Sequence, residues 1–176
     1  MEESDRDARL NLHALRVLWE HHWWSFEEFL TAAFALSDEE FQRELGLSYG
    51  SVHGILAHII GAEQVWLKRV VAGESVSIIP GTQEMRDKAA IKEAWEMTKV
   101  GWQRVLQEGR MERVIHYRNT KGQEFSDPLW RLMAHLVDHS ATYRGILISA
   151  LRILGRTPPA SGVIMYTRAV SGKGQQ

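Results

Sequence analysis

Four long segments of this chain repeat apolar side chains at steps of three and four residues, and no other feature constrains the fold as strongly. Such spacing places the apolar side chains along one side of an α-helix. We therefore expect helices at about residues 7–35, 51–72, 86–108 and 127–154. Four amphipathic helices bury their apolar sides by packing together, which predicts an all-α fold, a four-helix bundle.

Residues at the segment ends support these boundaries. Gly73 follows the second segment, as expected for a helix C-terminus. The fourth segment begins with Asp127 as the expected N-cap and Pro128 in the first helical position. Before it, VIHYRNTKGQEF (residues 114–125) carries β-branched and aromatic residues around a polar, glycine-containing turn. This pattern predicts a short β-hairpin before the last long helix.

The chain reads as one domain, because its 176 residues contain no internal repeat and no linker. We assign residues 1–170 to a single domain and expect the polar tail 171–176 to be flexible. Hydrophobic residues make up 44% of the chain, which is enough for a core. Because cysteine is absent, thiolate metal sites, disulfides and cysteine nucleophiles are excluded.

Charge and hydropathy narrow the range of partners. The 21 basic and 22 acidic side chains give a net charge of −1, and lysine and arginine do not cluster. Nucleic acid is therefore not an expected partner. No apolar run approaches the ~18 residues of a membrane span, and the acidic N-terminus has no apolar signal core. We expect a cytoplasmic protein that does not insert into membranes.

The stretch HLVDHSATYRG carries His135, His139 and Tyr143 at steps of four residues. At about 100° per residue, Tyr143 falls within the apolar stripe, His139 at its edge and His135 further out. His58 lies at the edge of the apolar stripe of the second helix. Imidazoles at such edges can bind a divalent metal, and a catalytic site needs three protein ligands. The same positions also suit histidines that only form hydrogen bonds beside the core.

Three stretches together resemble the DinB family of bacterial proteins. They are LGLSYGSVHGILAHIIGAEQVWLKRVVAGES (45–75), VIHYRNTKGQEFSDPLWRLMAHLVDH (114–139) and RGILISALRILGRTPP (144–159). The resemblance implies a four-helix bundle, a homodimer, and a divalent metal, zinc or nickel, held by three histidines. It also implies a metal-dependent hydrolase or thiol S-transferase, whose small-molecule substrate could be a low-molecular-weight thiol.

The family pattern places one metal ligand at His58 and two at the positions of His139 and Tyr143. The tyrosine is the departure that matters, because a phenol with a reference pKa of about 10 stands where a neutral imidazole is expected. His22, on the inward side of the first helix, is either a substitute ligand or a residue that hydrogen-bonds within the bundle.

Two functions follow from this departure. The first is a DinB-like metal-dependent enzyme with a divalent ion at His58, His139 and Tyr143. The second is a metal-free family member that acts as a stress-associated binding or structural dimer, in which metal binding is lost because Tyr143 stands at the third ligand position.

Overall fold

The computed structural model describes residues 2–172, with side chains from residue 12 onward. The predicted all-α class is confirmed, together with the short antiparallel hairpin. Of the predicted flexible tail, residues 171 and 172 close the last helix, and 173–176 lie outside the described residues. The elements in chain order are α1 (Glu2–Phe34), α2 (Asp38–Gln42), α3 (Val52–Ala72), α4 (Lys88–Glu108), β1 (Val114–Arg118), β2 (Glu124–Pro128), α5 (Leu129–Ile153) and α6 (Val163–Gly172).

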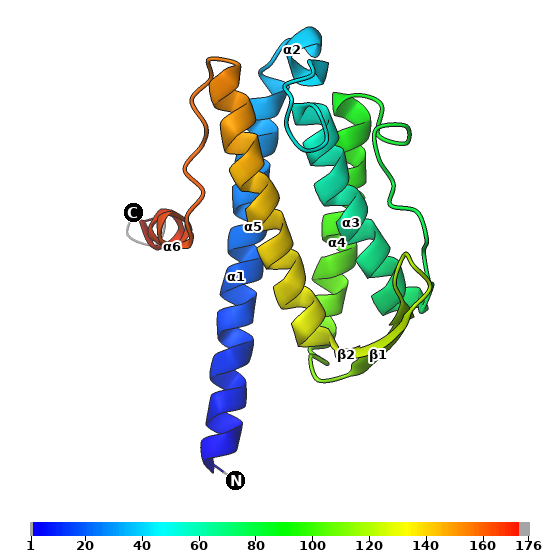
Figure 1. The fold of residues 1–176 in the computed structure, drawn as a ribbon. Helices are drawn as coiled ribbons and strands as arrows, with labels where there is room; N and C mark the ends of the chain where they lie inside the picture. Colours follow the sequence, from blue (N-terminus) through cyan, green and yellow to red (C-terminus); the bar gives the residue numbers. More distant parts are fainter. Residues whose placement is uncertain (1, 173–176) are drawn as a thin grey trace.

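Helices α1, α3, α4 and α5 form the bundle, with α3 packed against both α4 and α5, and α1 packed against α5 (Figure 1). Their apolar sides meet in one core. The fully buried side chains of that core include Trp19, Phe26, Ile55, Ile59, Trp102 and Met133. Because every bundle helix contributes to this core, the three- and four-residue spacing seen in the sequence has a direct structural cause.

Local sequence signals fix most helix ends. Ser51 caps α3 by accepting a hydrogen bond from Gly54, and Gly73 ends the helix in the left-handed conformation at φ 67°. The start of α5 differs from the prediction, because Asp127 pairs with Ile115 in the hairpin and Pro128 takes the N-cap position. The Asp127 carboxylate instead accepts a hydrogen bond from the Tyr117 hydroxyl at 3.0 Å.

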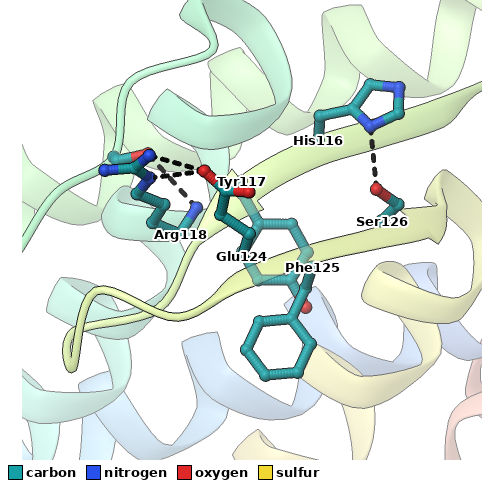
Figure 2. A pocket seen from close by; sticks show the side chains of 7 residues that line it. His116, Tyr117, Arg118, Glu124, Phe125 and Ser126 are labelled. Carbon is teal, nitrogen blue, oxygen red and sulfur yellow. Dashed lines mark hydrogen bonds and ion pairs between the residues drawn. The ribbon is translucent and has the colours of Figure 1, made fainter.

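The hairpin packs at one end of the bundle, between α4 and α5 in the chain (Figure 1). A hollow of 320 Å³ lies along it, and the side chains around this hollow pair across the strands (Figure 2). The His116 Nδ1 lies 2.8 Å from the Ser126 Oγ, and Arg118 forms an ion pair with Glu124. Such cross-strand pairs stabilise the hairpin, which accounts for the polar groups in this hollow.

Helix α6 was not predicted from the sequence. It packs on α1 (Figure 1), where the buried Tyr166 donates a hydrogen bond from its hydroxyl to Glu20 at 3.0 Å. The segment before it is fixed by His21, whose Nε2 lies 2.7 Å from the carbonyl oxygen of Ser161. Among the helices described, none is both long and apolar enough to cross a lipid bilayer.

Candidate functional site

The packing of α3 against α5 brings His58 and His139 together, although they are 81 residues apart in the sequence. Their Nε2 atoms lie 3.2 Å apart. His58 is buried, with 8% of its surface exposed, and His139 is half-buried. The structure therefore places both predicted histidines in one pair at the edge of the core.

Both rings are neutral at physiological pH. Burial lowers the pKa of His58 from 6.5 to about 4. Burial also lowers the pKa of His139 to about 4, with a smaller contribution from repulsion by His58. Each uncharged imidazole keeps one nitrogen lone pair, which is the form that binds metal ions.

Tyr143 lies one helical turn beyond His139, as the four-residue spacing predicts. Its ring centroid is 4.5 Å from that of His58 and 4.6 Å from that of His139. The side chain is half-buried. The predicted third residue thus packs against both imidazoles.

His22 lies in a different cluster. Its Nδ1 accepts a hydrogen bond from the Arg144 guanidinium at 3.2 Å, and its Nε2 lies 2.9 Å from the Glu63 carboxylate. Because arginine only donates, these partners assign the proton of His22 to Nε2, facing the carboxylate. The same guanidinium nitrogen donates to Ser140 at 3.0 Å. One ring nitrogen of His22 is hydrogen-bonded and the other lies within ion-pair distance of a carboxylate, which agrees with a role in hydrogen bonding within the bundle.

His135 is exposed, and its ring centroid is 6.0 Å from that of His139. It contacts Trp66 in an edge-to-face arrangement at 5.7 Å. The structure therefore keeps His135 outside the imidazole pair, as its position on the helical projection predicts.

Tyr49 belongs to the site but was missed in the sequence. Its ring stacks on the imidazole of His58, with centroids 3.8 Å apart and planes within 13° of parallel. Burial raises the pKa of Tyr49 to about 12, with a smaller contribution from the neighbouring Tyr143, so this phenol is neutral at physiological pH. Tyr49 lies in the loop before α3, where helical periodicity carries no information about side-chain direction.

Two of the three expected ligands, His58 and His139, have a geometry that suits a divalent ion. Two nitrogens bound at 2.0–2.1 Å to a tetrahedral ion lie about 3.3 Å apart, close to the 3.2 Å between these Nε2 atoms. Within the described part of the chain, however, no group of three His, Cys, Asp or Glu side chains could hold a metal ion. Tyr143 is the residue present at the third position, as a neutral phenol or, once deprotonated, an anionic oxygen donor.

Comparisons with known proteins agree with this architecture. The DinB family model matches residues 9–173 of the chain. The crystal structure of a DinB-like protein from Bacillus cereus ATCC 10987 aligns with a TM-score of 0.57 and 18% sequence identity, covering 81% of this chain and 91% of that one. Among curated proteins, no significant match was found. Because the family match spans nearly the whole chain, this protein belongs to the DinB family.

Proposed function

We propose that this DinB-family protein is a metal-dependent enzyme, a hydrolase or a thiol S-transferase, in which His58 and His139 bind a divalent zinc or nickel ion. The observation that supports the proposal is the 3.2 Å convergence of two neutral imidazole nitrogens from different helices. When bound, the ion supplies Lewis-acid chemistry that activates a water molecule or a thiol.

The protein's own residues prepare the site in two ways. Because the pKa of each histidine is lowered to about 4, protons do not compete with a metal ion near neutral pH. Tyr143 is the proposed third ligand, or a hydrogen-bond donor to the substrate. It is half-buried, as is His139, so part of each side chain is exposed to solvent on this side of the pair. Glu63 has only 1% of its surface exposed and faces His22, which argues against a role as a general base for a substrate.

The second candidate function is a metal-free binding or structural dimer. It is favoured by the tyrosine at the third position and by an apolar face on α1 and α5. That face carries two grooves, of 520 and 590 Å³, which share Leu18. Leu18 and Trp130 each expose 39% of their surface there. A homodimer through this face would bury these side chains, and a metal-dependent enzyme could use the same dimer.

Metal content separates the two functions. The wild-type protein, purified without a histidine tag, is incubated with zinc, dialysed and measured by elemental analysis, beside His139→Ala, Tyr143→His and His135→Ala. The enzyme proposal expects about one zinc ion per chain in the wild type and in His135→Ala, and its loss in His139→Ala. A wild type without zinc, together with a Tyr143→His variant that holds it, would overturn the proposal and support the metal-free function.

The dimer is tested by light scattering after gel filtration. We expect a mass twice the 20.2 kDa of one chain, and a return to the monomer mass in Leu18→Glu. Val71→Glu is the matched control, because Val71 exposes 66% of its surface but lies on α3, outside both grooves. A monomeric wild type would contradict the dimer.

A further inference from the structure

We infer that Tyr49 is a positioning residue, whose stacked ring holds the imidazole of His58 with its Nε2 directed at His139. The structural part of this inference concerns the protein without metal. Its consequence for metal affinity rests on the proposed function.

Within the described residues, neither histidine of the pair donates from its Nδ1 to a carboxylate or a carbonyl. A metal-binding histidine normally donates from its second ring nitrogen to a carboxylate, a carbonyl or a water molecule, which fixes the ring. Here the Nδ1 of His139 is buried and has no hydrogen-bond partner among the described residues. For His58, the hydrogen bond found within this part of the chain is the one to His139. Packing around the His58 ring therefore adds to the single hydrogen bond in orienting it.

Tyr49 provides that packing. Its ring lies nearly parallel to the imidazole, 3.8 Å from centroid to centroid, and covers one face of it. Tyr143 contacts the same imidazole edge-on, at 4.5 Å and 63°. Rotation of the imidazole about its bond to Cβ would drive its edge into the Tyr49 ring. The two tyrosines thus restrict the plane of the His58 ring, and in that plane its Nε2 faces His139.

The backbone sets the position of the Tyr49 ring. Tyr49 has a φ of 64°, and within the described residues no other residue except glycine has a positive φ. Such a conformation is unfavourable for a bulky side chain and persists only where surrounding contacts impose it. Its carbonyl accepts a hydrogen bond from the Ser51 amide at 2.8 Å. A Cβ at position 54 would lie 1.9 Å from the Tyr49 carbonyl oxygen, so Gly54 is what allows the loop to dock on α3.

The test compares Tyr49→Phe, Tyr49→Ala and Tyr49→Gly in the full chain. Proton NMR of the metal-free protein reads nuclear Overhauser contacts between the His58 and His139 rings, which report the orientation of His58 whether or not a ring stands at position 49. We expect Tyr49→Phe to keep these contacts and both small substitutions to lose them. Zinc titration by calorimetry gives the second measurement: we expect affinity within about threefold of wild type for Tyr49→Phe, and a loss of about 10- to 100-fold for the other two.

The glycine variant controls for stability. Because glycine adopts a positive φ without strain, Tyr49→Gly should melt at a higher temperature than Tyr49→Ala while losing the same zinc affinity. Wild-type-like contacts between the His58 and His139 rings in Tyr49→Ala and Tyr49→Gly would overturn the positioning role. Unchanged zinc affinity in Tyr49→Ala and Tyr49→Gly would also overturn the positioning role, but it would leave the proposed function intact. If the wild type binds no zinc, the proposed function fails, and the NMR comparison still decides the role of Tyr49.

Discussion

Helix α5 contributes to two polar clusters that differ in charge and burial. Ser140 and Arg144 face the interior cluster with His22 and Glu63, where a guanidinium and a carboxylate flank one imidazole. The residues just before them, His139 and Tyr143, face His58 at the bundle edge.

A shift of one residue turns the side chain by about 100°, so the same four-residue repeat serves both clusters. In the interior cluster, the Arg144 guanidinium and the Glu63 carboxylate lie on opposite sides of His22 and are shielded from water. The edge cluster holds neutral rings and no charged group, because burial lowers the pKa of both His58 and His139 to about 4. The contrast separates a charged cluster inside the helix packing from a neutral cluster at the bundle edge, where we propose that the two imidazoles bind an ion.

The largest effect is expected from breaking the interior cluster. Glu63→Gln leaves the buried Arg144 without its opposite charge, and we expect a loss of about 3 kcal/mol or more in the free energy of unfolding, measured by urea denaturation. The control is Arg156→Ala, which removes a more exposed ion pair with Glu40 and should cost much less. Equal losses in the two variants would show that the interior cluster has no special stabilising role.

The next effect concerns the edge cluster. Tyr143→His supplies a third imidazole beside His58 and His139, and we expect zinc affinity to rise at least about tenfold, measured by competition with a chelating dye. The free energy of unfolding should change by about 1 kcal/mol or less, because Tyr143 is only half-buried. An unchanged zinc affinity would mean that position 143 does not contribute a ligand.

The pH dependence of stability should also come from the edge cluster. The pKa of His58 is about 4 in the folded protein and 6.5 as its ordinary value, so between these pH values the unfolded chain binds more protons. Stability is therefore complete above pH 6.5 and falls as the pH drops toward 4, by up to about 1 kcal/mol per pH unit. Urea denaturation across this range should show a shallower slope for His58→Gln. An equal slope in that variant and the wild type would contradict the neutral buried state of His58.

The smallest effect is expected at His135. Because its side chain is exposed and its ring lies apart from the pair, His135→Ala should leave zinc affinity within about threefold and stability within about 0.5 kcal/mol. The same chelator competition and urea measurements apply. A loss of zinc in this variant would indicate that the metal site lies one turn nearer the start of α5, at His135.

Much of the fold could be predicted because it is encoded locally. The apolar spacing and the caps indicated the bundle helices, and turn residues indicated the hairpin. The predicted start of α5 was wrong. Asp127 followed by Pro128 is a favourable helix start, but Asp127 pairs with Ile115 in the hairpin instead. Helix α6 was missed because its packing on α1, through Tyr166, is a long-range contact that a short periodic segment does not indicate.

The candidate site could be predicted only where a helix sets side-chain direction. Register and family resemblance together indicated His58, His139 and Tyr143. Tyr49 could not be found in this way, because its direction depends on a positive φ in a loop. The partners of His22 come from α3 and α5. Whether His22 binds a metal or forms hydrogen bonds therefore depends on how three helices pack, which the sequence does not indicate.

We propose above all that the edge cluster binds an ion through two imidazoles, and that His22 stays in the interior cluster and is not a metal ligand. X-ray absorption spectroscopy of the zinc-loaded wild-type protein, without a histidine tag, tests this most directly. We predict scattering from two imidazole rings, from His58 and His139, with oxygen completing the coordination. A third imidazole in the spectrum, or a protein that retains no zinc after dialysis, would contradict the claim.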